Sequence, residues 1–271
     1  SMQEAAFQKL GLEAHYLVFD LMPKFFKKVM SRSAKLPLSG FNITVPYKQT
    51  VVKYLDKISP EARMIGAVNT AFRRGTQWVG TNTDMEGFLL SLEKEGKFRL
   101  GGKKAVILGA GGAARAVVCG LSKKRVREIL VTDCFPEKAF KIVRDFKKIF
   151  PKTQYQAVIP GAGEVRVAVR EANLVINATP LGLKPKDPAV IPGDWIPHAR
   201  GKKKLFMDLI YNPEVTPFLS MARRKGHRIL NGLPMLLYQG ARALEYWTGR
   251  RAPVGVMRRA LLEALKGKKR P

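Results

Sequence analysis

Between residues 105 and 208, short apolar runs alternate with longer stretches of mixed polarity. The apolar runs have the continuous character of strands buried on both faces, and they cover residues 105–108, 128–132, 174–178 and 205–208. The stretches 113–122 and 136–150 repeat apolar residues at helical spacing. Strands that alternate with helices in this way predict a doubly wound α/β sheet.

The first third of the chain mixes helix and strand patterns. Amphipathic stretches predict a helix at residues 4–10, ended by Gly11, and another at 23–31, whose apolar side carries Phe25, Phe26, Val29 and Met30. Apolar runs predict strands at residues 16–20 and 40–45 and a hairpin within 67–79 that turns at Arg74-Gly75. We also expect a connecting helix at 84–96 and final helices at 236–247 and 254–266.

The chain carries a large excess of positive charge, because 49 Lys and Arg against 21 Asp and Glu give a net charge of +28. Such a field attracts anionic partners, including phosphorylated cofactors and carboxylate substrates. The basic residues are spread along the sequence and form a dense run only at residues 266–270. No nucleic-acid-binding module accompanies them. We therefore expect a solvated basic surface and no specific nucleic-acid function.

Other features of the sequence exclude whole classes of protein. Hydrophobic residues make up 46% and charged residues 26%, which is typical of a globular chain and excludes global disorder. No apolar run reaches the roughly 18 residues of a membrane helix, and the beginning of the sequence does not resemble a signal peptide. The spacings of the cysteines (Cys119, Cys134) and histidines (His15, His198, His227) indicate no disulfide framework and no metal site. We expect a cytoplasmic protein without a metal, present as a monomer or a homodimer.

A glycine-rich motif directly follows the apolar run at 105–108. Residues 109–114 read Gly-Ala-Gly-Gly-Ala-Ala and fit the G-x-G-x-x-G/A pattern, with Gly109, Gly111 and Ala114 at the small positions. Gly109 permits a tight turn, Gly111 lets the backbone approach a pyrophosphate, and Ala114 keeps the helix close to the strand. The helix N-terminus offers free N–H groups to the anion. A strand, a glycine loop and a helix in this order predict a dinucleotide-binding site.

Asp133 lies at the end of the next predicted strand. An acidic side chain at that place hydrogen-bonds the ribose 2′-hydroxyl of NAD and repels the 2′-phosphate of NADP. The alternative is that Asp133 only caps the helix that begins near Pro136. Asp133 favours NAD over NADP, although nearby Lys138 could still attract a phosphate.

Six short motifs follow one another along the chain. They read Asn-Ile-Thr-Val-Pro-Tyr-Lys from Asn42, Ala-Val-Asn-Thr from Ala67, Asn-Thr-Asp-Met-Glu-Gly from Asn82, Asn-Ala-Thr-Pro-Leu-Gly from Asn177, Asp-Leu-Ile-Tyr-Asn-Pro from Asp208 and Asn-Gly-Leu-Pro-Met-Leu from Asn231. In this order and spacing they resemble the shikimate/quinate dehydrogenase family over residues 2–265. Six ordered motifs are far more specific than any one of them.

The resemblance implies an oxidoreductase that moves a hydride between NAD or NADP and a small cyclic hydroxy acid, shikimate. Lys48 matches the family's catalytic lysine and Asp84 its partner aspartate, a pair that can hold and relay the hydroxyl proton. Other matches are to residues that contact the substrate: Asn42, Thr44, Asn69, Tyr211 and Gln239. The matches to cofactor-binding positions are Gly109, Ala110, Gly111, Gly112, Ala113, Asp133, Thr179, Leu181, Gly232 and Met235. Without the motifs, Thr44 would read as a strand end and Met235 as a core residue.

The resemblance also implies a two-domain α/β architecture. It places a Rossmann-type doubly wound parallel sheet domain, which binds the dinucleotide, at residues 85–232. A smaller α/β substrate domain is formed by residues 1–84 and 233–271.

Two departures from the family pattern affect the interpretation. The family has a first strand and a Ser-x-Ser loop, whose serines bind the substrate carboxylate, before the helix expected at 4–10, and the present sequence opens at Ser1-Met2. Relatives that use NADP carry an Asn-Arg-Thr-like segment where this chain has Asp133-Cys134-Phe135. The absence of that Arg favours NAD and the quinate/shikimate branch.

Two alternative functions therefore stay open. One is a quinate/shikimate dehydrogenase that prefers NAD and quinate. The other is a catalytically impaired, basic binding protein on the same fold, suggested by the net charge and by the missing serine loop. A folate-type methylene dehydrogenase is disfavoured because its motif would differ at Lys48.

Overall fold

A computed structural model describes residues 1–161 and 163–267, and the chain forms two compact units. One unit consists of residues 1–87 together with the chain from residue 236 onward, and the other of residues 88–235. No helix in the described ranges has both the length and the apolar character that crossing a membrane requires. Of the basic run at 266–270, residues 268–270 lie outside the described part of the chain.

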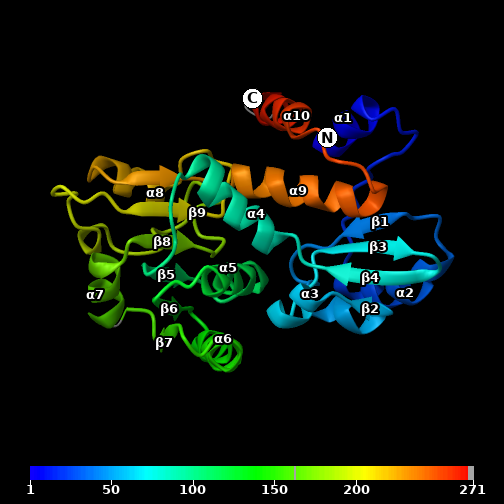
Figure 1. Cartoon of the computed structure of the whole chain (residues 1–271). Helices are drawn as coiled ribbons and strands as arrows, with labels where there is room; N and C mark the ends of the chain where they lie inside the picture. The colour runs from blue at the N-terminus through cyan, green and yellow to red at the C-terminus, as the bar shows by residue number, and fades with distance from the viewer. Residues whose placement is uncertain (162, 268–271) are drawn as a thin grey trace. The chain divides into compact units, whose positions relative to one another are not determined.

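The first unit contains a four-stranded mixed sheet in the order β1-β3-β4-β2 (Figure 1). β1 and β3 and then β3 and β4 pair antiparallel, whereas β2 pairs parallel to β4. The strands are β1 (Gly40–Asn42), β2 (Lys57–Ile58), β3 (Thr70–Arg74) and β4 (Gln77–Thr81). β3 and β4 form the predicted hairpin, and Gly75 adopts the left-handed conformation at its turn, with φ of 62°.

Helices of the first unit bury apolar faces in two separate cores. Phe26 and Met30 of α2 pack with Val51 and Trp78 over the sheet, and Phe7 of α1 packs in a second core with residues of α9 and α10. The helices are α1 (Met2–Lys9), α2 (Pro23–Arg32), α3 (Pro60–Ile65), α9 (Leu233–Thr248) and α10 (Val254–Gly267), with short 3-10 turns η1 (Ser33–Lys35) and η2 (Thr50–Tyr54). The helices predicted at both ends of the chain are confirmed.

The strand expected at residues 16–20 is wrong. Residues 13–22 have no regular secondary structure, and Leu17, Val18 and Phe19 are 69%, 86% and 75% exposed. An extended segment becomes a strand only when a neighbour satisfies its N–H and C=O groups. Within the described residues, β1 pairs only with β3. The 16–20 segment therefore has no hydrogen-bonded partner strand in β1.

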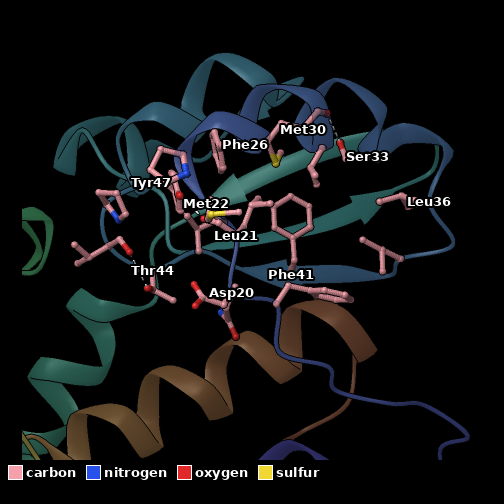
Figure 2. Close-up of a pocket in the computed structure, with 18 of the residues that line it drawn as sticks. Asp20, Leu21, Met22, Phe26, Met30, Ser33, Leu36, Phe41, Thr44 and Tyr47 are labelled. Carbon is pink, nitrogen blue, oxygen red and sulfur yellow. Dashed lines mark hydrogen bonds between the residues drawn. The ribbon is translucent and has the colours of Figure 1, made fainter.

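A mostly apolar cavity of about 730 Å³ lies between this segment, α2 and β1. Phe26 and Met30 point from α2 toward Leu21 and Phe41 (Figure 2). The sequence predicts that Phe25, Phe26, Val29 and Met30 share one apolar side of α2. In the structure only Phe26 and Met30 are buried, whereas Phe25 and Val29 are 43% and 37% exposed. The predicted strand at 40–45 is also shorter, and the chain leaves the sheet after Asn42.

The second unit contains a six-stranded parallel sheet in the order β10-β9-β8-β5-β6-β7. Its strands are β5 (Lys104–Leu108), β6 (Glu128–Thr132), β7 (Gln154–Val158), β8 (Leu174–Asn177), β9 (Leu205–Asp208) and β10 (Arg228–Leu230). Strand order reverses between β5 and β8, which makes the carboxyl ends of these two strands the switch point where such sheets bind ligands. The predicted doubly wound sheet is confirmed.

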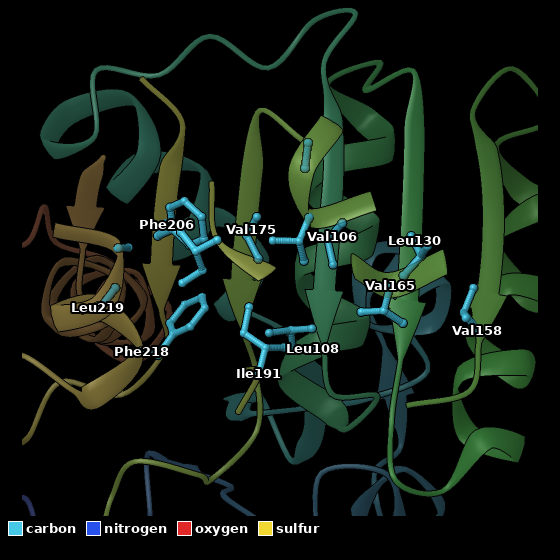
Figure 3. Close-up of a cluster of buried hydrophobic side chains, with 14 residues drawn as sticks. Val106, Leu108, Leu130, Val158, Val165, Val175, Ile191, Phe206, Phe218 and Leu219 are labelled. Carbon is cyan, nitrogen blue, oxygen red and sulfur yellow. The ribbon is translucent and has the colours of Figure 1, made fainter. Parts of the chain in front are cut away.

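Helices cover the sheet of the second unit and bury its strands. Val106, Leu130, Val175 and Phe206 project from four strands into one apolar layer, where they meet helical side chains such as Phe218 (Figure 3). The helices are α5 (Gly112–Lys123), α6 (Pro136–Ile149), α7 (Gly163–Glu171) and α8 (Pro217–Arg224), with a 3-10 turn η4 (Gly193–Trp195). The connecting helix begins as α4 (Asp84–Leu90) and continues as a π-helical turn, η3 (Ser91–Glu95).

Candidate active site

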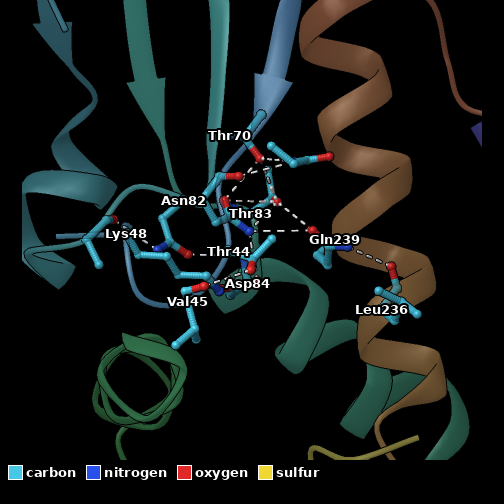
Figure 4. A network of polar contacts seen from close by, with 12 residues as sticks. Thr44, Val45, Lys48, Thr70, Asn82, Thr83, Asp84, Leu236 and Gln239 are labelled. Atoms are coloured by element: carbon cyan, nitrogen blue, oxygen red, sulfur yellow. Dashed lines mark hydrogen bonds and ion pairs between the residues drawn. The ribbon is translucent and has the colours of Figure 1, made fainter. Parts of the chain in front are cut away.

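Lys48 and Asp84 form an ion pair in the first unit, with 2.7 Å between Lys48 Nζ and Asp84 Oδ2. Lys48 lies in the turn after β1, and Asp84 is the first residue of α4. Both side chains are largely buried, with 15% and 7% of their surface exposed (Figure 4). A pair that is shielded from water interacts more strongly than one on the surface.

Asn69 holds the second oxygen of the aspartate. Its Nδ2 donates to Asp84 Oδ1 at 2.8 Å, and its Oδ1 accepts from the backbone N–H of Thr83 at 2.8 Å. The backbone bond fixes which end of the amide faces Asp84, because only the amide oxygen can accept from an N–H. Asn69 therefore orients the carboxylate that pairs with Lys48.

Gln239 joins this group from α9. Its Oε1 lies 3.4 Å from Asn69 Nδ2, and its Nε2 donates to the carbonyl of Leu236 at 3.0 Å. Thr44 is exposed, and its hydroxyl contacts only the neighbouring Val45 carbonyl among the bonds of the described residues. The sequence-predicted residues Lys48, Asp84 and Gln239 are thus brought together, with Thr44 in the loop that precedes Lys48 (Figure 4). The hydrogen bonds of Asn69 to Asp84 and Gln239 place it in the same group.

Asn42 has a different environment from the other predicted substrate residues. Its Nδ2 donates to the Asn69 carbonyl at 3.1 Å and to Thr70 Oγ1 at 3.0 Å, and its Oδ1 accepts from the Tyr16 hydroxyl at 3.0 Å. These bonds use both amide N–H groups, so Asn42 connects β1 to β3 and to the 13–22 segment. Burial raises the pKa of Tyr16, which keeps its hydroxyl a donor.

Among the members of the polar network that sequence reasoning missed are Tyr16 and Thr83. Tyr16 falls within the segment taken for a strand, and a single Tyr gives no signal of a distant amide partner. Thr83 stands inside the Asn-Thr-Asp motif, and its hydroxyl lies within hydrogen-bond distance of Asn69 and Thr70. The motif itself was therefore the signal for Thr83.

Two glycines of the glycine loop in the second unit differ in the space around them: Gly109 is closely packed, whereas Gly111 is open. Gly109 has φ of 107°, and a Cβ there would lie 2.9 Å from the backbone of Ala178. Gly111, the N-cap of α5, would meet nothing within 4 Å and offers no side chain to the N–H groups of the first helical turn. The fold thus requires a glycine at 109, whereas the open space at Gly111 fits the pyrophosphate of a dinucleotide.

Asp133 ties the glycine loop to the end of β6. Its Oδ2 accepts from the Ala110 N–H at 2.6 Å, and its Oδ1 accepts from the Phe135 N–H at 2.8 Å. A carboxylate has about four acceptor positions, so capacity remains for a ribose hydroxyl. Lys138 lies nearby, with its Nζ 4.0 Å from the centre of the Phe135 ring.

The remaining predicted residues also belong to the second unit. Thr179 donates its hydroxyl to Asn177 Oδ1 at 2.7 Å and accepts from the Leu181 N–H at 3.1 Å. Gly232 packs against the backbone of Leu209, where a Cβ would come within 2.0 Å of the carbonyl oxygen. Gly112 and Ala113 open α5, and Met235 is buried. Tyr211 is 38% exposed and lies in the second unit, unlike the other predicted substrate residues.

A parallel sheet with a glycine loop at its switch point, together with a buried Lys–Asp pair, defines an oxidoreductase that uses NAD or NADP. Residues 1–71 match the family model described as the shikimate dehydrogenase substrate binding domain, and residues 232–262 match the shikimate 5′-dehydrogenase C-terminal domain. The shikimate dehydrogenase (NADP(+)) of Symbiobacterium thermophilum is 41% identical over 274 residues, which cover 98% of this chain and 90% of that protein.

Two solved structures are also similar. Shikimate 5-dehydrogenase from Listeria monocytogenes, in complex with shikimate and NAD, is 34% identical with a TM-score of 0.86, covering 96% of this chain and 90% of that one. Quinate dehydrogenase from Corynebacterium glutamicum, in complex with NAD, is 29% identical with a TM-score of 0.86, covering 97% and 93%. The chain belongs to the shikimate dehydrogenase family.

Proposed function

We propose that this protein catalyses reversible hydride transfer between a nicotinamide dinucleotide and shikimate, with 3-dehydroshikimate as the oxidised partner. The observation that carries the proposal is the buried ion pair between Lys48 and Asp84, whose second oxygen is held by Asn69. A surface pair would be solvated and free to move, whereas this one has a fixed orientation.

Lys48 is the proposed acid and base of the reaction. Oxidation of a secondary alcohol needs a group that takes the hydroxyl proton as the hydride leaves, and a bound nicotinamide ring supplies the hydride acceptor. In the oxidation, the neutral amine of Lys48 takes the hydroxyl proton and becomes an ammonium. In the reverse reaction, the ammonium returns a proton to the carbonyl oxygen while another of its N–H groups donates to Asp84. Asp84 holds the Lys48 side chain in place through the 2.7 Å ion pair.

Polar side chains beside Lys48 are proposed to select the substrate. Asn69, Gln239 and Thr44 can hydrogen-bond ring hydroxyls and the carboxylate, and Tyr211 is a further proposed contact from the second unit. A site built from such groups rejects analogues that lack a hydroxyl, because its own polar atoms would then stay unpaired. The internal bonds of Asn42 favour a supporting role in which it holds Asn69 and β1 in register.

The two units are proposed to bind different ligands. The unit formed by residues 1–87 and the chain from 236 onward would bind the substrate, and the unit 88–235 would bind the dinucleotide. The expected limits, 85–232 and 233–271, differ from these by three residues at each crossing. Both crossings fall inside helices, α4 and α9, where composition gives no boundary signal.

We further propose a preference for NAD. Asp133 presents a negative charge where a 2′-phosphate would have to lie, and Cys134 follows it in place of the Arg of the NADP-using relatives. The relative from Symbiobacterium thermophilum is named for NADP, and Lys138 beside Phe135 is the basic residue that would favour it here. The quinate dehydrogenase bound to NAD makes quinate the second candidate substrate.

The test is a set of four assays that follow nicotinamide reduction, with shikimate and quinate each offered with NAD and NADP. Turnover of shikimate with either dinucleotide supports the proposed reaction, and the faster dinucleotide decides the preference. Turnover of quinate alone would replace the substrate and keep the mechanism. Folded protein that is silent in all four assays would overturn the proposed activity and favour a binding protein.

A further inference from the structure

Asp208 is a buried carboxylate at the carboxyl end of β9 that the proposed reaction does not use. It stands opposite Asn177, the last residue of β8, and both residues are 0% exposed. Burial raises the pKa of Asp208 above its ordinary range. Buried carboxylates are costly to maintain, and well-packed apolar replacements are often as stable. Stability alone therefore does not account for this group.

Four hydrogen bonds converge on the Asp208 carboxylate. Asn177 Nδ2 lies 3.1 Å from each of its oxygens, the Ile210 N–H donates to Oδ1 at 3.0 Å, and the Thr216 hydroxyl donates to Oδ2 at 2.6 Å. Every partner is a donor, so the site is built for a carboxylate that accepts on all sides.

Asn177 transmits this arrangement to the loop that follows β8. Its Oδ1 accepts from the N–H of Thr179 at 3.0 Å and from the hydroxyl at 2.7 Å, while its Nδ2 also reaches the Leu181 carbonyl at 3.1 Å. A flipped amide would set its oxygen against the carboxylate and its N–H groups against the Thr179 N–H. Asp208 thus fixes the amide, and the amide fixes the loop.

The turn after β9 carries the same constraint to a second segment. The Gly232 N–H donates to the Ile210 carbonyl at 2.9 Å, and Gly232 packs directly on Leu209. Leu209 and Ile210, which contact Gly232, belong to the turn that Asp208 holds by accepting from the Ile210 N–H. The segments of Thr179, Leu181 and Gly232, all proposed cofactor positions, therefore depend on one carboxylate.

We propose that Asp208 is a positioning residue for dinucleotide binding, acting through Asn177 on the Thr179–Leu181 loop and through Ile210 on Gly232. The inference rests on the proposed function, since it requires that the second unit binds a dinucleotide. Asp208 itself has no exposed surface with which to contact a ligand.

The test is the Asp208→Asn variant, titrated with NAD and NADP by quenching of intrinsic fluorescence. The new amide N–H group would face Asn177 or Thr216, both donors, so the network loses at least one bond. We expect the dissociation constant to rise about tenfold, the effect of one lost hydrogen bond of ordinary strength. The KM for shikimate should change less than about twofold. Glu171→Gln, a carboxylate paired with Lys104 at the amino end of β5, is the matched control and should leave binding unchanged.

A double variant that exchanges the amide and the carboxylate distinguishes a positioning role of Asp208 from a general loss of packing. In the double variant Asn177→Asp with Asp208→Asn, an amide and a carboxylate again face each other, so binding should recover part of the loss. If Asp208→Asn does not fold, Thr216→Val removes the 2.6 Å donor, together with the 3.3 Å N-cap bond that Thr216 Oγ1 accepts from the Leu219 N–H, and should weaken binding severalfold. Unchanged dinucleotide affinity in the folded variant, or in Thr216→Val, overturns the inference. Wild-type protein that binds neither dinucleotide overturns the proposed function instead.

Discussion

Lys48 Nζ and Asp84 Oδ2 lie 2.7 Å apart although the two residues are 36 positions apart in the chain. The pair joins the turn after β1 to the start of α4, and Asn69 closes the group from the residue before β3. Three separate parts of one unit therefore define the position of a single carboxylate. A network of this kind fixes geometry better than any one bond within it.

Lys48→Ala should lower kcat by about 10²- to 10⁴-fold, the usual contribution of a positioned acid or base. The dissociation constant for the dinucleotide should stay nearly unchanged, because Lys48 belongs to the other unit. Steady-state kinetics and a fluorescence titration measure the two quantities. Lys53→Ala, an exposed lysine five residues on, is the control. Unchanged turnover in Lys48→Ala would remove Lys48 from the mechanism.

Gly109→Ala and Gly111→Ala should affect different properties of the protein. At Gly109 the φ of 107° and the nearby Ala178 backbone make a Cβ unfavourable, so thermal stability should fall by about 1–3 kcal/mol. At Gly111, φ is −78° and the surroundings are open, so stability should change little while dinucleotide affinity falls. Thermal denaturation and dinucleotide titration of both variants check this, and equal stability losses would contradict it.

Asp133→Asn should shift the dinucleotide preference toward NADP by about tenfold, measured as the ratio of kcat/KM values. The amide oxygen can still accept from the Ala110 N–H, so the glycine loop keeps its anchor while the negative charge is lost. Glu128→Gln at the other end of β6 is the control and should not alter the ratio. An unaltered ratio in Asp133→Asn would limit Asp133 to its structural role.

The stability of the protein should decrease as the pH falls below 6.5, partly through His227. Burial lowers the pKa of His227 below 6.5, and its Nδ1 accepts from the Lys204 N–H at 3.3 Å, which requires the neutral ring. The unfolded chain therefore takes up the proton first, so the contribution is complete above pH 6.5 and is lost between 6.5 and the lowered pKa of the folded state.

Urea denaturation of wild type and His227→Gln over this range of pH is the measurement. The Gln variant should show a flatter dependence of unfolding free energy on pH. His15→Gln removes an exposed histidine and should keep the wild-type slope. Parallel curves for wild type and His227→Gln would exclude His227 as the cause.

The parallel sheet was predictable where strands are buried on both faces. The run 128–132 coincides with β6 and 205–208 with β9, because the middle positions of a strand buried on both faces are apolar. β7 reads Gln-Tyr-Gln-Ala-Val at the sheet edge, and β10 has only three residues, so neither has a continuous apolar run. Edge strands of this kind need their neighbours to be known before they can be assigned.

The candidate site was predictable as far as the motifs reach. Lys48, Asn69 and Asp84 could be named from their motifs, since each stands at a fixed place in an ordered series. The contact of Tyr16 with Asn42, and the use of Asp133 to anchor Ala110, join segments with no common pattern. Such contacts depend on how the sheets bring distant loops together, which a local sequence pattern does not predict.

The exposed run Leu17–Phe19 and the open side of β1 have a consequence for the behaviour of the protein in concentrated solution. Unpaired backbone beside apolar side chains is a template on which a second molecule can pair. A net charge of +28 opposes that approach by mutual repulsion, and dissolved salt screens the repulsion beyond about 10 Å at 0.1 M. We therefore expect the protein to associate more readily as ionic strength rises.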